Sequence, residues 1–166
     1  MRETEKLKLA ERQTDMNPTE QQIEEGTYRK GNVTLKTFPI TIENPAGSIR
    51  SGIDEQGAPW ETKMTYSYGY FKNTVGADGD EVDIFIGPEI ENNFDVYIID
   101  QVEEQSREFD EHKVMFGFAS EGEAVKAYLD NYQTEWTGFK NITSFTLESF
   151  KEWLSDSDAT KVPVKK

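Results

Sequence analysis

The sequence predicts one α+β domain, mainly β, with strands first and helices last. Between positions 31 and 118, short runs rich in β-branched and aromatic residues are separated by turn residues. Beyond Ser120 the apolar residues recur at helical spacing instead. A chain of 166 residues with 35% apolar and 12% aromatic residues has the usual size of one domain and can bury a core without disulfides.

The first thirty residues are polar and predict a partly flexible N-terminal arm over residues 1–30. Within this arm, Pro18, Thr19 and Glu20 form a helix-start signal. A short helix is therefore expected to run from this point to a stop at Gly26.

The β-rich region begins at Gly31. Apolar residues at 33, 35, 40 and 42 predict two short strands around residues 37–39, and a third is expected at 48–52. Further strands are predicted at 66–71, 82–86, 95–100 and 113–118. Together these runs indicate a small curved sheet or barrel.

The C-terminal part predicts two helices. Ser120 stands at the N-cap of a helix over residues 121–132, with Glu123 at the position that a capping box needs. A second, aromatic-rich helix is expected over residues 147–154. The main domain is therefore predicted to span residues 31–155, followed by a loose tail over 156–166.

Composition excludes several classes of site. Cysteine is absent and His112 is the single histidine, so thiolate chemistry and multi-histidine metal sites are excluded. A net charge of −14 disfavours nucleic acid and anionic membranes as partners. For the same reason Trp60, Trp136 and Trp153 are interpreted as packing residues rather than as a base-stacking platform. A charged N-terminus and the lack of a long apolar run predict a soluble, cytoplasmic protein.

An acidic loop is the strongest chemical signal. Asp78, Asp80 and Asp83 fall within six residues, and Gly79 lets the backbone turn so that the first two can converge. Carboxylate oxygens without nitrogen or sulfur ligands suit magnesium, manganese or calcium. A solvated hairpin turn and a calcium-binding EF-hand loop ending at Glu89 are the alternatives, although Asp83 stands where the EF-hand requires glycine.

Several motifs resemble those of a known family. Tyr68-Gly-Tyr, Thr74 and the aspartates from Asp78 to Asp83 resemble the central signature of soluble family I inorganic pyrophosphatases. The segment 109–114 is similar to the later strand of that family, where acidic metal ligands precede a phosphate-binding lysine. The run 42–45 and Arg50 are similar to its first acidic and basic site residues. Most of the chain resembles, more closely still, the pyrophosphatase-like domain of bacteriophage and mobile-element proteins.

This resemblance implies a small closed OB-like β-barrel with C-terminal flanking helices. It implies hydrolysis of pyrophosphate or a related phosphoanhydride, which includes nucleotides, with Mg²⁺ as cofactor and Mn²⁺ as a substitute. The metal ligands implied are Asp78, Asp80, Asp83 and Asp110, with Asp100 or Glu111 as a further ligand. Asp80 would also activate the attacking water.

The resemblance also implies residues that contact the substrate. Arg50 and Lys113 would neutralise the phosphates, and Tyr68 would donate a hydrogen bond. Lys72 is a reserve cation. Glu43 and Tyr132 are the other residues implied to contact the substrate. Gln133 stands where the family has a lysine, which indicates a shifted substrate preference.

Other interpretations of these residues stay open at this point. Lys113 beside Glu111 is compatible with a surface ion pair, and Tyr68 with core packing. Strand alternation points His112 away from both neighbours and favours a structural role. A second function is a degenerate module that binds a nucleotide, a metal or a protein partner without turnover. The oligomeric state cannot be read from the sequence.

Overall fold

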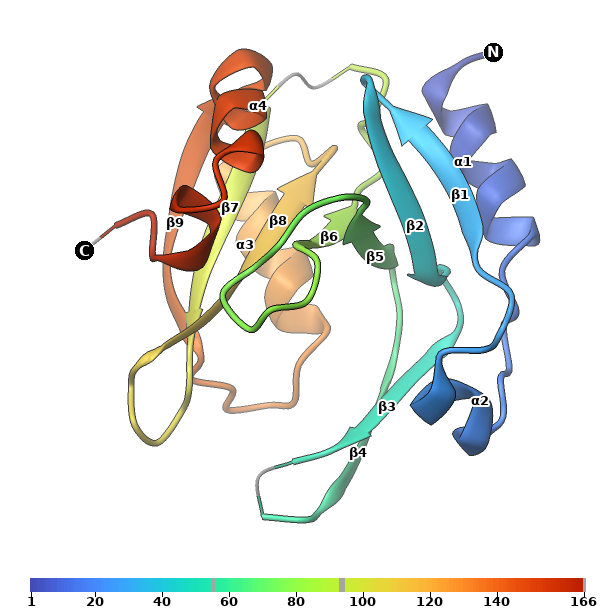
Figure 1. Ribbon diagram of the computed structural model, residues 1–166, viewed down its shortest axis with the longest axis horizontal. Helices are drawn as coiled ribbons and strands as arrows, with labels where there is room; N and C mark the ends of the chain where they lie inside the picture. The colour runs from blue at the N-terminus through green and yellow to red at the C-terminus, as the bar shows by residue number, and fades with distance from the viewer. Residues whose placement is uncertain (55, 93–94, 166) are drawn as a thin grey trace.

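The computed structural model describes residues 1–54, 56–92 and 95–165 (Figure 1). Its helices are α1 (Glu3–Arg12), α2 (Glu20–Glu25), α3 (Glu121–Asp130), α4 (Leu147–Ser155) and a 3₁₀ turn at Ala159–Lys161. Its strands are β1 (Gly31–Leu35), β2 (Phe38–Asn44), β3 (Ile49–Ile53), β4 (Pro59–Lys63), β5 (Ser67–Phe71), β6 (Asp83–Ile86), β7 (Asp95–Val102), β8 (Phe109–Phe116) and β9 (Phe139–Thr146). The mainly β, α+β class is confirmed.

Seven strands form one mixed sheet in the order β1-β2-β5-β6-β8-β7-β9. Its neighbours are antiparallel except β6 and β8, which run parallel. The remaining two strands, β3 and β4, pair only with each other and form a ribbon that projects from the body of the molecule (Figure 1).

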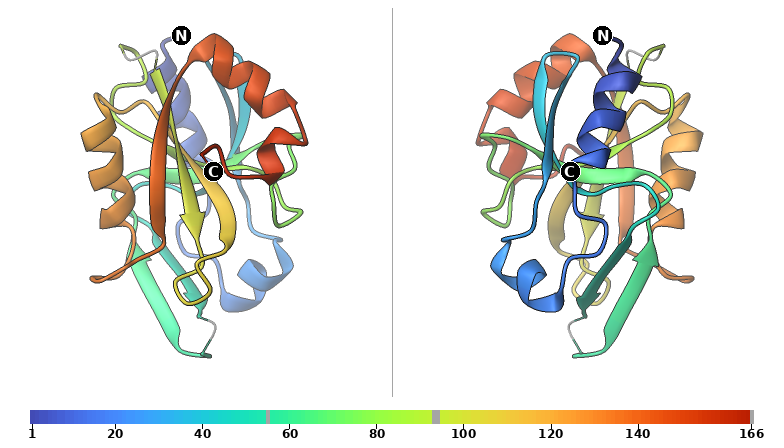
Figure 2. Two further views of the ribbon diagram at one scale, coloured as in Figure 1. Left: turned by 90° about the vertical axis from the view of Figure 1, so that its left-hand side faces the viewer. Right: turned by 90° about the vertical axis from the view of Figure 1, so that its right-hand side faces the viewer.

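Apolar side chains fill both faces of this curved sheet. On one face, residues of β1, β2, β7 and β8 pack against Phe150 and Trp153 of α4. On the other, Phe85, Ile99 and Met115 pack against Tyr128 of α3. The two helices therefore cover opposite faces of the β7–β8–β9 region, as Figure 2 shows. Strands that are buried on both faces explain the near-continuous apolar runs at β6 and β7.

The expected closed OB-like barrel is not confirmed. Within the described residues, β1 and β9 are the two edges of the sheet and do not pair with each other. The Phe150 ring lies 5.2 Å from Phe38 of β2, and the Trp153 ring lies 6.2 Å from Phe145 of β9. Side chains of α4 thus occupy the space between the two ends of the sheet, so apolar packing takes the place of strand closure.

The order of elements also differs from strands first and helices last. The expected short helix is present as α2, with a capping box at Thr19 and Gly26 in the left-handed conformation at its end. A second N-terminal helix, α1, was not predicted, and its Leu7 and Ala10 are buried. Ala10 lies so close to β1 that a Cβ on Gly31 would come within 2.0 Å of its carbonyl oxygen.

The C-terminal segment contacts the body of the protein at several points. The Thr160 hydroxyl donates to the Val75 carbonyl at 2.7 Å. The backbone amides of Val164 and Lys165 donate to the two carboxylate oxygens of Asp100 at 2.9 and 3.0 Å. None of the helices in the described ranges has both the length and the apolar character needed to cross a membrane.

Candidate active site

Two β-bulges direct acidic side chains toward the site. The β2–β5 pairing shifts between Ile42 and Asn44, which leaves Glu43 as an extra residue. The β7–β8 pairing shifts between Gln101 and Val102, which leaves Asp110 as an extra residue in the same way. A bulge breaks the simple alternation of side chains. Asp110 and its neighbour Glu111 therefore line the same cavity, which regular alternation would forbid.

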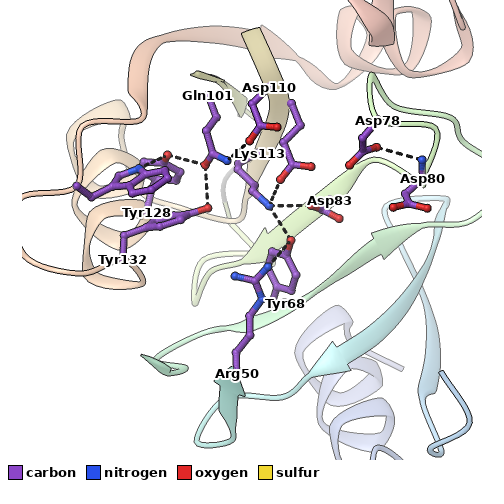
Figure 3. A network of polar contacts seen from close by, with 12 residues as sticks. Arg50, Tyr68, Asp78, Asp80, Asp83, Gln101, Asp110, Lys113, Tyr128 and Tyr132 are labelled. Carbon is purple, nitrogen blue, oxygen red and sulfur yellow. Dashed lines mark hydrogen bonds and ion pairs between the residues drawn. The ribbon is translucent and has the colours of Figure 1, made fainter. Parts of the chain in front are cut away.

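Lys113 stands at the centre of the polar cluster (Figure 3). Its Nζ atom donates to Tyr68 Oη at 2.8 Å and to Asp83 Oδ2 at 2.7 Å, and it pairs with Glu111 Oε1. Because Lys113 is 1% exposed, the interpretation as a surface pair is wrong. Burial alone would lower the pKa of Lys113, but Asp83 and other neighbours outweigh it and raise that pKa well above the ordinary value. The ammonium group is therefore charged at neutral pH.

A second cation reaches the same hydroxyl. Arg50 of β3 donates to Tyr68 Oη at 3.5 Å, and its guanidinium lies 4.4 Å from the centre of the Tyr68 ring. Tyr68 also packs against Phe85, so it has both the core role and a polar contact. Burial, and then the Asp83 carboxylate, raise the pKa of Tyr68 well above its usual value. A neutral hydroxyl thus joins the two cations.

Glu43 lies on the same side as these groups. It is half-buried, and its pKa is raised by burial first and then by the charge of Asp83, while Lys30, Arg50 and Lys113 oppose the rise. The bulged position of Glu43 therefore adds one more carboxyl group to the environment of the two cations.

The acidic loop connects β5 to β6. Gly79 has φ +88°, the left-handed conformation that glycine adopts without strain, so the expected turn is present. The Asp80 amide donates to Asp78 Oδ1 at 3.0 Å, and the Thr74 hydroxyl accepts from the Val82 amide at 2.9 Å. Residues Asp83–Ile86 form strand β6, so the EF-hand alternative, which needs a loop there, is wrong.

The carboxylates have the chemistry of a magnesium site. Asp78, Glu81, Asp83 and Glu111 line one small hollow beside the loop, and all offer the hard oxygen ligands that Mg²⁺ prefers. Across the described residues, no three acidic or histidine side chains stand close enough together to hold a cation as they are. Two of the four, Asp83 and Glu111, are instead paired with Lys113 and share its single positive charge. The donor set therefore fits the ion, and a bound cation would have to draw these groups together.

A cavity of about 500 Å³ lies next to the cluster. Arg50 and Lys113 line it, together with Tyr132, whose hydroxyl donates to Gln101 Oε1 at 2.8 Å. Gln101 in turn donates to Asp110 Oδ2 at 3.0 Å and accepts from the Tyr128 hydroxyl. Gln101 was not predicted from the sequence. Its side chain bonds Asp110 and Tyr132, which are 9 and 31 positions away, and no local motif marks such a residue.

Two predicted site residues, Asp100 and Lys72, are not brought to this cluster, and His112, which was expected to be structural, lines only the small hollow beside the acidic loop. Asp100 pairs in register with His112, on the opposite face of the strands from Glu111, and its carboxylate bonds the C-terminal amides. His112 is 3% exposed with its ring 4.9 Å from Trp153, so the structural role expected from alternation is confirmed. In the part of the chain that the structure describes, the Lys72 side chain lines neither cavity and makes no hydrogen bond or ion pair to the site residues.

A cavity that ends in a buried lysine and a half-buried arginine among carboxylates is typical of proteins that bind phosphorylated ligands. The family model of inorganic pyrophosphatase matches residues 20–155, and the chain therefore belongs to the inorganic pyrophosphatase family. A solved structure of the inorganic phosphatase from Anaplasma phagocytophilum is also similar, at 16% identity and a TM-score of 0.31, over 92% of this chain and 100% of that one. No curated protein matches the chain.

Proposed function

We propose that this protein hydrolyses inorganic pyrophosphate or a related phosphoanhydride in a reaction that depends on a divalent metal. The observation that carries this proposal is the meeting of Arg50 and Lys113 at the Tyr68 hydroxyl, at the edge of a carboxylate-rich cavity. The membership of the inorganic pyrophosphatase family supports it.

The two cations would bind the phosphate groups. Lys113 is buried and charged at neutral pH, so it offers a point charge that is shielded from bulk water. Arg50 presents a planar fork that suits two phosphate oxygens at once. Tyr68 would keep the two groups close together, and its hydroxyl would donate to the substrate when Lys113 turns toward a phosphate.

The carboxylates would hold the metal. Asp78, Asp80, Asp83, Asp110 and Glu111 are the proposed ligands of Mg²⁺, with Mn²⁺ as a substitute. When bound, the metal would acidify water and neutralise phosphate charge. The Asp80 carboxylate would take the proton from the attacking water, and Glu43 and Tyr132 would contact the substrate. Lys72 stays a reserve cation from the sequence alone, and Asp100 is left out because its oxygens are bonded to the C-terminal segment.

One observation favours the second candidate function, a binding module without turnover. Asp83 and Glu111 are already paired with Lys113, and within the described residues no three carboxylates converge. A site that kept this arrangement would bind an anion through Arg50 without assembling a metal cluster.

Phosphate release separates the two candidates. The parent should release phosphate from pyrophosphate with Mg²⁺, and Arg50→Ala should reduce kcat/KM by about a hundredfold, as expected for loss of a charge-assisted contact in the transition state. Arg12→Ala, which removes an exposed arginine of α1, is the matched control. Pyrophosphate binding without phosphate release, with Mg²⁺ or Mn²⁺, would favour the binding module. The phage or mobile-element setting and a cytoplasmic location stay proposals from the sequence.

A further inference from the structure

The cavity beside the two cations is larger than inorganic pyrophosphate needs. Its volume of about 500 Å³ lies within the roughly 300–1,000 Å³ of sites that enclose drug-sized organic ligands. The acidic loop does not account for this space, because Asp78 and Asp83 line the separate small hollow instead. The large cavity therefore extends away from the acidic loop, although Asp110 and Glu111 line it beside Lys113.

Charge is distributed unevenly along this cavity. Arg50 and Lys113 lie at the polar cluster, whereas Asp54, Glu103 and Glu104 also line the cavity and repel anions from their part of it. The phosphates of a ligand would therefore lie near Arg50 and Lys113. The rest of the ligand, near the acidic side chains, should therefore carry no negative charge.

Aromatic side chains also line the cavity, and the Arg50 guanidinium lies 5.3 Å from the centre of the Trp60 ring. The ring of Trp60, on β4, packs closely on Gly52 of the partner strand β3. A Cβ atom added to Gly52 would lie 2.6 Å from that ring. Trp136 stacks on Tyr132 with ring centres 4.4 Å apart and an angle of 15° between the planes. Its Nε1 atom donates to the Tyr128 hydroxyl at 2.8 Å, which fixes the indole in place.

These rings are held in place before any ligand binds. Trp136 is fixed by a stacked ring and a hydrogen bond, and Tyr132 is fixed by its bond to Gln101. A preorganised aromatic surface loses little side-chain entropy when a flat ligand stacks on it. The exposed amides of Gln105 and Gln133 line the same cavity and offer donors and acceptors to the edges of such a ligand.

We infer that the cavity takes a phosphoanhydride that carries a planar aromatic group, of the nucleoside diphosphate class, with its ring against Trp60 or the Tyr132–Trp136 pair. The placement of the phosphates at Arg50 and Lys113 rests on the proposed function. The aromatic group is recognised independently, by the rings and the volume of the cavity. The net charge of −14 opposes a nucleic acid strand, so the ligand inferred is a single nucleotide.

Binding of two non-hydrolysable probes tests this inference. Methylene diphosphonate and the α,β-methylene analogue of adenosine diphosphate share the bridged phosphates and differ in the nucleoside. In titrations with Mg²⁺, the parent should bind the adenosine analogue at least about tenfold more tightly, since stacking of one base contributes about that much. Equal affinity of the parent for both probes would overturn the inference.

Variants of Trp60 locate the aromatic contact. Trp60→Ala should lower the affinity ratio of the two probes about fivefold or more, whereas Trp60→Phe, which keeps a ring, should keep most of it. Trp60 belongs to neither buried core, so both variants should fold. Ile49→Ala, on the same ribbon but outside the cavity, is the control. Trp136→Ala is tested in the same way, and an unchanged ratio in both alanine variants would overturn the inference.

Failure of this inference and failure of the proposed function give different results. Phosphate release from pyrophosphate together with equal affinity for the two probes would support the proposed hydrolase function and contradict the inferred aromatic ligand. No release from pyrophosphate or adenosine diphosphate, together with a ratio that falls in the alanine variants, would support the ligand class and contradict hydrolysis.

Discussion

Replacement of Lys113 by methionine should show how strongly the carboxylates of the site depend on this cation. The change keeps most of the aliphatic side chain and removes the charge that Asp83 and Glu111 share. Removing one partner from a buried ion pair costs about 3–5 kcal/mol, because the remaining charge is left unpaired. The Asp83 and Glu111 side chains are 18% and 20% exposed, so solvent relieves part of this cost.

We therefore expect Lys113→Met to lower the free energy of unfolding by about 3 kcal/mol when divalent metal is removed with a chelator. In a protein of this size, this corresponds to a fall of roughly 6–12 °C in Tm. Urea denaturation followed by circular dichroism measures the free energy directly. The matched control is Lys126→Met on α3, where the lysine side chain is 74% exposed and pairs only with Asp130 in the same helix. There the loss should stay below about 1 kcal/mol.

Added Mg²⁺ should reverse much of the loss in Lys113→Met. The two carboxylates that Lys113 releases would be free to bind the cation, and a ligand of the native state stabilises it by mass action. The gain in Tm with millimolar Mg²⁺ should be larger in this variant than in the parent or in Lys126→Met. If Lys113→Met without metal were as stable as the control, or if Mg²⁺ raised the Tm of no protein in the set, the proposed electrostatics of the site would be refuted.

Three further predictions follow from other parts of the molecule. With saturating Mg²⁺, Asp80→Asn should lower kcat for pyrophosphate about 100-fold or more with little change in KM, and a parental kcat would exclude Asp80 as the base. Burial raises the pKa of Asp100, but bonds from His112 and two backbone amides outweigh it and lower that pKa. In urea denaturation at pH values falling below the ordinary 3.8, the parent should therefore lose stability that Asp100→Asn does not lose, and parallel curves would contradict this. Deletion of residues 1–25 should leave a cooperative thermal transition, with Tm lower by roughly 5 °C because Leu7 and Ala10 are buried; an unchanged Tm would show that α1 adds no stability.

Elements with apolar alternation or strong caps could be predicted from the sequence. The strands β1, β2, β5, β6 and β7 carry such patterns, and Thr19 and Ser120 cap their helices as expected. Strand β4 was missed because its residues alternate between exposed and half-buried positions and include no buried apolar residue. Helix α1 was missed because charged residues dominate it and only Leu7 and Ala10 are buried. In both cases tertiary contacts, and not local pattern, determine the element.

The site was predictable where its residues lie in one short motif. The aspartate loop, Tyr68 and Lys113 were found in this way, and the structure brings Lys113, Tyr68 and Asp83 into direct contact. The cavity was not predictable, because β4, β7 and the segment after α3 contribute Trp60, Gln101 and Trp136 from distant positions. All three tryptophans were interpreted as packing residues. Trp153 packs in one core, and Trp136 packs against the other and also lines the cavity, whereas Trp60 lines the cavity and belongs to neither core.

Direct observation of the reaction by ³¹P nuclear magnetic resonance tests the central claim most directly. Pyrophosphate would be mixed with the purified parent protein in a chelator, and Mg²⁺ would then be added in excess. The pyrophosphate signal should persist until Mg²⁺ is present and should then be replaced by orthophosphate, at a rate that Lys113→Met lowers and Lys126→Met does not. A pyrophosphate signal that stays unchanged after the addition of Mg²⁺ or Mn²⁺ would contradict hydrolysis by this protein.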